Sequence, residues 1–184
     1  MRSANRVALL VVVPSRHVVA AGWRAPTTRL RSVLGLSFGA LIRSQPMKIP
    51  DSVRTVLEGP GLAHLVTIEP DGRPQVSIVW VGLDGDEIVA GHLPEHRKIR
   101  NMRRDPRVVL SVEAGTRNQL GLDEYLVVHG RARITEGGAA ELLQRLAHVY
   151  LGPEVRFPPM DDPPPDYITH ISVDRIGGVG PWAR

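Results

Sequence analysis

The middle of the chain alternates three apolar, β-branched runs with two short turns, and this pattern restricts the fold more than any other part of the sequence. The runs are LAHLVTIE (62–69), QVSIVWVGL (75–83) and EIVAGHL (87–93). They are separated by PDGRP (70–74) and DGD (84–86), in which Asp-Gly accepts the positive φ that tight hairpin turns need. Strands joined by such short turns pair in antiparallel order. The stretch therefore predicts a three-stranded antiparallel meander.

The rest of the chain adds helices and further strands to this meander. The pattern predicts a helix that Asp51 or Ser52 caps and Gly59 ends, a helix over 94–105, a helix over 139–152, strands over 107–115, 124–136 and 167–180, and a loop over 158–166. The helix over 139–152 has one apolar stripe, formed by Leu142, Leu143, Leu146 and Tyr150. Six strands in short antiparallel units predict a mainly β fold: a small six-stranded antiparallel β-barrel with peripheral helices.

Positive charge is concentrated in two segments of the chain. Residues 1–46 hold seven arginines and no acidic residue, and HRKIRNMRRDPR (96–107) holds five arginines and one lysine beside a single aspartate. Residues 47–184 as a whole carry 16 basic against 19 acidic side chains, although the complete chain has a net charge of +4. A general polyanion binder spreads its cations over a whole face. The distribution instead predicts a local anion site and no nucleic-acid partner.

Residues 1–46 differ from the rest of the chain in more than charge. VALLVVV (7–13) imitates the apolar part of a signal peptide, but it is too short to span a bilayer and Pro14 follows it. We interpret 1–46 as a disordered extension or as the product of a start codon assigned too far upstream, with export as the alternative. The residues that begin at Met47 are enough for one core. We therefore expect a single domain over 47–184, in the cytoplasm and without a membrane partner.

Most signatures of catalysis are absent from the sequence. The chain has no cysteine, which excludes disulfides, thiolate metal sites and thiol nucleophiles. It has no G-x-G-x-x-G motif after a strand, no P-loop, no G-x-S-x-G and no H-E-x-x-H. Its histidines show no metal-ligand spacing, and its paired acidic residues fall in expected turns or loops. We therefore predict no catalytic side chain and no metal site.

The basic segment remains as the candidate functional site. Ile99 and Met102 are spaced to point inward from a helix, which leaves Arg97, Arg100 and Arg104 on the outside. Arg97 and Lys98 fall in the first turn, where free backbone N–H groups and the helix dipole favour an anion. Each charge-assisted hydrogen bond to a phosphate there is worth roughly 1.5–3 kcal/mol. The alternative is a solvated helix face.

The order of these elements resembles a known family. The pattern DGRPQ, then RK-x-x-N-x-x-R-D-P-R-V, then a closing GPW resembles the pyridoxamine 5′-phosphate oxidase-like split β-barrel superfamily. Within it, the chain most resembles the branch that uses the deazaflavin coenzyme F420 in place of FMN. The resemblance covers nearly all of 49–184 and implies a split β-barrel that binds a cofactor. The chain ends in GGVGPWAR, without the Arg-Leu-x-Pro-type C-terminus of the oxidases, so we do not expect oxidation of vitamin B6.

The resemblance also implies which residues contact the cofactor. In relatives, the strand after the D-G-R-P turn lies along the cofactor ring, and the Arg-Lys pair of the following helix binds the cofactor phosphate. Transferred to this sequence, the implied cofactor-binding residues are Ser77, Ile78, Val79, Gly91, His92, Arg97, Lys98 and Asn101. Arg100, Arg103 and Arg104 would face either the anionic oligoglutamate tail of F420 or solvent.

The function implied by the resemblance is an oxidoreductase in which reduced F420 transfers hydride to a small unsaturated organic substrate. The family further implies a homodimer with the cofactor at the subunit interface. Two alternatives stay open at this point. One is an FMN-dependent oxidase or reductase of the same fold, and the other is a non-catalytic carrier of a flavin-type cofactor or a pigment.

Overall fold

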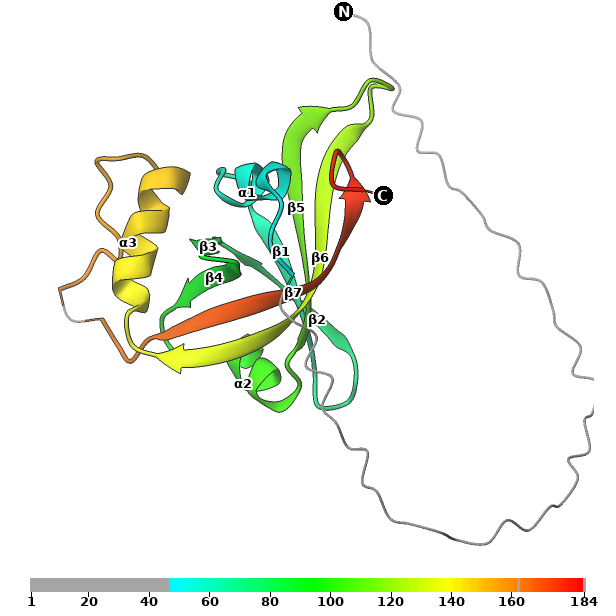
Figure 1. The fold of residues 1–184 in the computed structure, drawn as a ribbon. Helices are drawn as coiled ribbons and strands as arrows, with labels where there is room; N and C mark the ends of the chain where they lie inside the picture. The colour runs from blue at the N-terminus through cyan, green and yellow to red at the C-terminus, as the bar shows by residue number, and fades with distance from the viewer. Residues whose placement is uncertain (1–46, 162, 184) are drawn as a thin grey trace, which may run out of the picture. The chain divides into compact units, whose positions relative to one another are not determined.

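The computed structural model describes residues 47–161 and 163–183 (Figure 1). The expectation for 1–46 lies outside the described residues. The described residues form seven strands and three helices in the order α1 (Asp51–Leu57), β1 (Ala63–Ile68), β2 (Pro74–Val79), β3 (Gly82–Asp84), β4 (Glu87–His92), α2 (Arg97–Arg104), β5 (Arg107–Arg117), β6 (Asp123–Glu136), α3 (Ala139–Tyr150) and β7 (Tyr167–Val179). The mainly β fold with peripheral helices is therefore confirmed.

The seven strands form one antiparallel sheet in the order β2-β1-β5-β6-β7-β4-β3. The predicted number of six differs from this because the single strand expected over 75–83 is divided at Trp80 and Val81. Its first part, β2, pairs with β1, and its second part, β3, pairs with β4 at the opposite edge of the sheet. Two residues therefore join the two edges, and the sheet curls without closing through hydrogen bonds. The predicted six-stranded barrel is therefore not confirmed: the sheet has seven strands and is open.

Tyr150 explains why the strand breaks where it does. Its hydroxyl accepts a hydrogen bond from the backbone N–H of Val81 at 3.1 Å, and the carbonyl oxygens of Val81 and Gly61 each lie 3.2 Å away. These contacts satisfy backbone groups that a continuous strand would use in its ladder. Burial raises the pKa of the Tyr150 phenol, so the hydroxyl keeps its proton. A side chain at the end of α3 thus stabilises the corner between β2 and β3.

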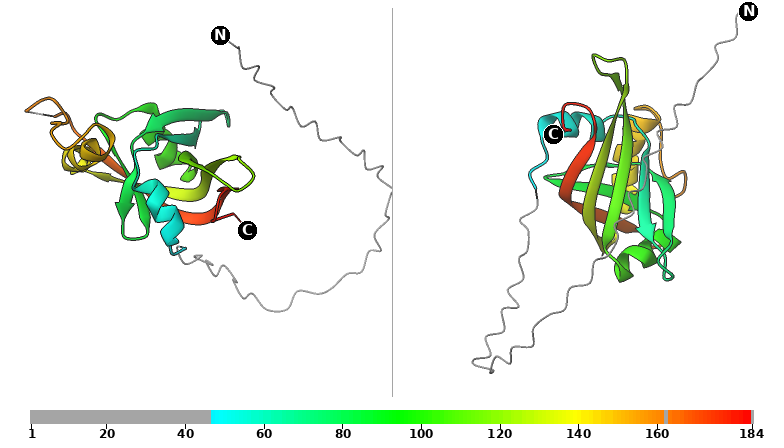
Figure 2. Two further views of the ribbon diagram at one scale, coloured as in Figure 1. Left: turned by 90° about the horizontal axis from the view of Figure 1, so that it is seen from above. Right: turned by 90° about the vertical axis from the view of Figure 1, so that its right-hand side faces the viewer.

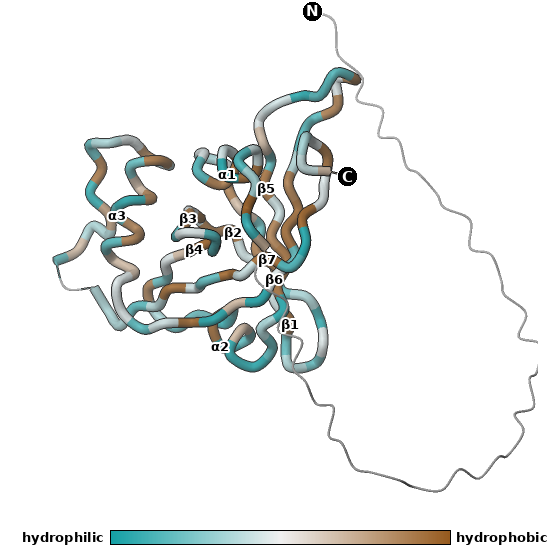
Figure 3. The backbone as a smooth tube through the Cα atoms, in the orientation of Figure 1, coloured by the Kyte–Doolittle hydropathy of each residue, from teal (hydrophilic) through white to brown (hydrophobic). Residues whose placement is uncertain are grey.

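The three helices pack around the curled sheet at different places (Figures 1 and 2). The main core lies inside the sheet and includes Leu65, Ile88, Leu110, Leu126 and Ile171. A second, smaller cluster joins β4 to α3 through Val89, Leu142 and Leu146. Figure 3 shows that apolar residues recur along the strands and along α3. The apolar stripe predicted on this helix is the face that packs against β4, with Tyr150 half-buried at its end.

Helix α2 follows β4 closely, as the sequence predicts. Ile99 and Met102 are buried beneath it, while Arg97, Arg100 and Arg104 are exposed. The alternation predicted on β6 is also confirmed, because Val128, Gly130 and Ala132 are buried and Ile134 is half-buried.

The cap predicted for α1 is wrong. Pro50 occupies the N-cap position with extended backbone and without a side-chain cap, and Asp51 is the first helical residue. There, the carboxylate of Asp51 lies at the positive end of the helix dipole. None of the helices in the described part of the chain is both long and apolar enough to cross a lipid bilayer.

Candidate functional site

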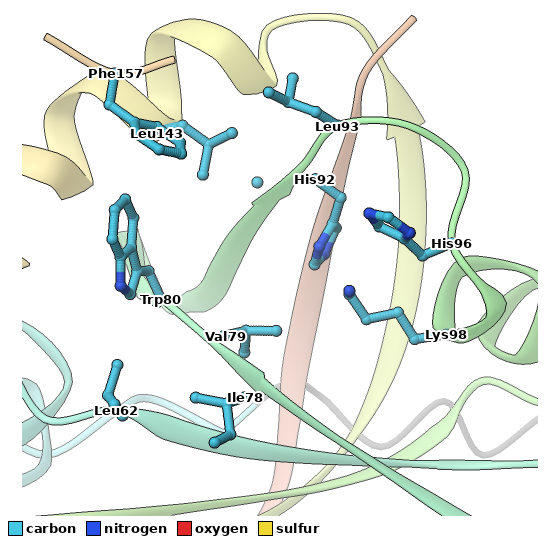
Figure 4. Close-up of a pocket in the computed structure, with 11 residues that line it drawn as sticks. Leu62, Ile78, Val79, Trp80, His92, Leu93, His96, Lys98, Leu143 and Phe157 are labelled. Atoms are coloured by element: carbon cyan, nitrogen blue, oxygen red, sulfur yellow. The ribbon is translucent and has the colours of Figure 1, made fainter. Parts of the chain in front are cut away.

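A pocket of about 290 Å³ opens where the ends of β2 and β4 meet the start of α2 and one side of α3 (Figure 4). Its two ends differ in chemistry. His92, His96 and Lys98 form one end, and apolar and aromatic side chains form the other. The complete lining consists of Leu62, Ile78, Val79, Trp80, Gly91, His92, Leu93, His96, Lys98, Leu143 and Phe157.

The structure brings most of the sequence-predicted residues to this pocket. Five of the eight line it: Ile78, Val79, Gly91, His92 and Lys98. The other three, Ser77, Arg97 and Asn101, are not part of the lining. Arg97 and Lys98 were predicted to bind the phosphate as a pair, but only Lys98 lines the pocket.

Lys98 lies in the first turn of α2, and its ammonium points into the space beside His92 and His96 (Figure 4). Within 47–161 and 163–183, no carboxylate forms an ion pair with it. Partial burial lowers the pKa of Lys98. The first turn of α2 contains no acidic residue either. A half-buried cation without a counterion, at the positive end of a helix, is the arrangement that attracts a bound anion.

Arg97 has a different environment, although it is the next residue. Its side chain is 68% exposed and forms an ion pair with Glu69, with 3.3 Å between Nη1 and Oε1. To contact a ligand in the pocket, the guanidinium would have to leave this carboxylate. Arg97 is therefore less well placed than Lys98 to contact a ligand in the pocket.

Asn101 is buried and belongs to a chain of hydrogen bonds behind the pocket. Its Nδ2 donates to Thr67 Oγ1 at 3.2 Å, and Thr67 Oγ1 donates to Gln75 Oε1 at 2.9 Å. Gln75 Nε2 in turn donates to Ser77 Oγ at 2.7 Å. The chain connects α2 to β1 and then to β2. Asn101 therefore fixes the position of the helix that carries Lys98, and Ser77 stands at the far end of the same network.

His92 is a neutral group in spite of its place beside a lysine. Its side chain is buried, and its Nε2 lies 2.9 Å from Thr169 Oγ1. Burial, with the positive charges of Lys98 and His96 as smaller causes, lowers the pKa of His92 to about 3. The imidazole therefore offers hydrogen bonding at neutral pH but no charge.

Gly91 lines the pocket, and the packing of α3 on β4 also requires a glycine at this position. A Cβ built on Gly91 would lie 2.8 Å from Leu143 Cγ and 3.1 Å from the carbonyl oxygen of Ala139. The absence of a side chain lets α3 approach β4 this closely. As a result, Leu143 reaches the pocket from α3.

The aromatic end of the pocket was not found from the sequence. Trp80 stacks on Tyr150, with ring centroids 5.3 Å apart and planes 16° apart, and lies against Phe157 at 5.1 Å. The chain has only eight aromatic residues, so three in one cluster are a large share. That scarcity is the sequence signal that could have indicated the cluster, because Trp80 lies 70 residues before Tyr150 in the chain. The other lining residues that the sequence analysis missed are Leu62, Leu93, His96 and Leu143.

Arg103 has structural contacts that its place among the outer arginines of α2 does not predict. Its guanidinium forms ion pairs with Glu95 and with Glu136, the latter at 2.9 Å, and lies 5.2 Å from the centre of the Tyr167 ring. These contacts join α2 to the ends of β6 and β7. Arg103 is therefore neither a simple solvated residue nor a free cation.

The other two outer arginines of α2 also contact the protein. Arg100 donates to the backbone carbonyl of Glu95 at 3.1 Å, and Arg104 donates to that of Ile68. Both side chains remain exposed. No three histidine, aspartate or glutamate side chains of the described ranges come together in a way that could hold a metal ion.

Comparison with known proteins agrees with this architecture. Residues 49–180 match the pyridoxamine 5′-phosphate oxidase family. The solved structure of an F420 reductase is 28% identical, with a TM-score of 0.57 over 70% of this chain and 98% of that one. A conserved hypothetical protein from Mycobacterium tuberculosis is 21% identical, with a TM-score of 0.55 over 74% of this chain and 87% of that one.

A third structure, from Listeria innocua and provisionally assigned as a pyridoxamine 5′-phosphate oxidase, is 18% identical. It aligns with a TM-score of 0.53 over 70% of this chain and 96% of that one. The two structures below 25% identity support the fold, and the family match extends over most of the chain. The chain therefore belongs to the pyridoxamine 5′-phosphate oxidase family.

Proposed function

We propose that this protein is an oxidoreductase that uses reduced coenzyme F420 to transfer hydride to a small unsaturated organic substrate. The observation that carries the proposal is Lys98, an ammonium without a carboxylate partner in the described structure, which faces a pocket at the start of a helix. A phosphate group is the chemical partner that this arrangement favours.

The pocket lining fits a ligand that has a phosphate and a flat ring. Lys98 would hold the phosphate, and the end of β2 at Ile78 and Val79 would lie along the ring. His92 is neutral and would add hydrogen bonding without adding charge. When it is bound, reduced F420 supplies the hydride. The side chains of the protein would position the ring, hold the phosphate and exclude water.

The choice of F420 over FMN is supported by the similarity to the F420 reductase, which the chain matches over nearly the whole length of that protein. Contact with an oligoglutamate tail is proposed only for Arg100 and Arg104, which are exposed. Arg103 already balances two carboxylates and is left out of the proposal.

We further propose that the protein is a homodimer. Val76 and Ile78 of β2 are 58% and 60% exposed, which is unusual for aliphatic side chains on a strand. Ile78 also lines the pocket, so a second copy that covers β2 would lie beside the bound ligand. This agrees with the arrangement that the family resemblance implies.

The direct test of the cofactor choice is a titration of the purified protein with F420 and, separately, with FMN, followed by the absorbance of each cofactor. We expect F420 to bind and FMN to bind more weakly. Tighter binding of FMN would overturn the choice of F420 and would favour a flavin enzyme of the same fold. Binding of F420 without any oxidation of its reduced form in the presence of unsaturated acceptors would favour a carrier.

A further inference from the structure

The apolar end of the pocket is built from two parts that are held in different ways. Trp80 is fixed by its stack on Tyr150, whose hydroxyl is bound to the backbone of Val81. Leu143 comes from the buried face of α3. Phe157 instead comes from the segment between α3 and β7, whose described residues form no helix or strand.

Gln144 holds this segment in place. Its Nε2 donates to the carbonyl oxygen of Val155 at 2.8 Å, and its Oε1 accepts from the backbone N–H of Phe157 at 2.9 Å. Both functions of one side-chain amide therefore bind the backbone on the two sides of Arg156. Six of the 16 residues from 151 to 166 are prolines, which have no backbone N–H to donate. The prolines reduce the number of backbone donors that could hold the segment on α3.

The result of this contact is a defined wall. Phe157 lies against Trp80 with ring planes 59° apart, and Figure 4 shows both rings and Leu143 at the end of the pocket opposite Lys98. The side chains at this end are uncharged and mostly apolar, and the charged and imidazole groups lie at the other end. A flat, uncharged ring fits carbon surfaces of this kind, because aromatic contacts add to simple burial.

We propose that Phe157 determines substrate specificity at this end of the pocket, that Gln144 is its positioning residue, and that the substrate carries an uncharged, flat apolar ring. The assignment of this end to the substrate rests on the function proposed above. The affinity of this end of the pocket for an apolar ring is independent of that function, since it depends only on Trp80, Leu143 and Phe157. A change in the segment after α3 would therefore alter which substrate is accepted without altering the phosphate contact.

The test uses N-phenyl-1-naphthylamine, an uncharged aromatic probe whose fluorescence rises in apolar surroundings, with the full chain and without any cofactor. We expect the parent protein to bind it. Phe157→Ala should weaken binding by about two- to tenfold, which is the value of one lost aromatic contact. The control is Arg156→Ala, which removes the neighbouring side chain and its exposed ion pair with Asp161 and should bind as the parent does.

Gln144 is tested by a double-mutant cycle with the same probe. Gln144→Leu keeps a good helix former on α3 but removes both hydrogen bonds to the segment. It should weaken binding in the parent and have no further effect in Phe157→Ala, because it acts only through Phe157. Equal weakening in both backgrounds would overturn the positioning role.

Two other results would overturn the proposal as a whole. These are a parent protein that does not bind the probe, and a stably folded Phe157→Ala protein that binds it as tightly as the parent. Neither result affects the F420 titration, because the probe has no phosphate. The two proposals therefore fail separately.

Discussion

At the scale of single residues, His92, His96 and Lys98 lie together, and burial lowers the pKa of both His92 and Lys98. The pKa of His92 is lowered to about 3, so this imidazole is neutral in the folded protein and is protonated below about pH 6.5 in the unfolded chain. The folded-state pKa lies below the unfolded one. The contribution of His92 to stability is therefore fully present above about pH 6.5 and is lost as the pH falls towards 3.

This predicts a specific pH dependence of the free energy of unfolding. As the pH falls from about 6.5 to 5, protonation of His92 in the unfolded chain should lower the free energy of unfolding by on the order of 2 kcal/mol. Each unit of pKa difference is worth about 1.4 kcal/mol. His92→Gln cannot take up the proton, so its free energy of unfolding should fall by that much less over the same pH range. Urea unfolding of both proteins at several pH values measures the difference. His64→Gln, a change at an exposed histidine, is the control. Parallel profiles for His92→Gln and the parent would contradict the assignment.

At the scale of elements, the corner between β2 and β3 depends on the hydroxyl of Tyr150. Tyr150→Phe keeps the stack on Trp80 but leaves the N–H of Val81 without its partner. We expect a loss of about 1–3 kcal/mol in the free energy of unfolding, the cost of an unsatisfied buried donor. The midpoint of urea denaturation measures it. Tyr125→Phe, at an exposed tyrosine, should change little. An unchanged midpoint in Tyr150→Phe would contradict the role of this hydroxyl in stabilising the corner.

The same corner shows how far the sequence predicts the elements. Alternation and turn residues predict the strands well, because each signal lies within one short stretch. The break at Trp80 and Val81 could not be predicted, since both residues favour strands and the side chain that stabilises the break is 69 residues away. The Asp51 cap failed for a local reason: Pro50 already fixes the backbone before the helix.

The candidate site, too, is only partly predictable from the sequence. The sequence predicts the basic first turn of α2 and the strand ends around it. It cannot distinguish Lys98 from Arg97, because the difference depends on Glu69, the residue that follows β1. The aromatic end was missed because Trp80, Leu143 and Phe157 meet only through the packing of α3 on β4.

At the scale of the whole molecule, the exposed apolar side chains of β2 predict self-association. The parent should sediment as a species of twice the chain mass of 20.2 kDa. Val76→Lys places a charge on this face and should give a monomer, while Val149→Lys, at an exposed valine of α3, should remain dimeric. Analytical ultracentrifugation distinguishes these results. A monomeric parent, or a dimer that Val76→Lys leaves intact, would contradict the proposed interface.

The central claim is that Lys98 holds the phosphate of F420, and titration of Lys98→Ala with F420 tests it most directly. We expect affinity to fall by about ten- to a hundredfold, as loss of a charge-assisted bond of roughly 1.5–3 kcal/mol requires. Lys98→Arg should recover only part of it. Arg107→Ala, whose side chain is 70% exposed and pairs with Asp105, should bind as the parent does. A stably folded Lys98→Ala protein with unchanged affinity for F420 would contradict the account.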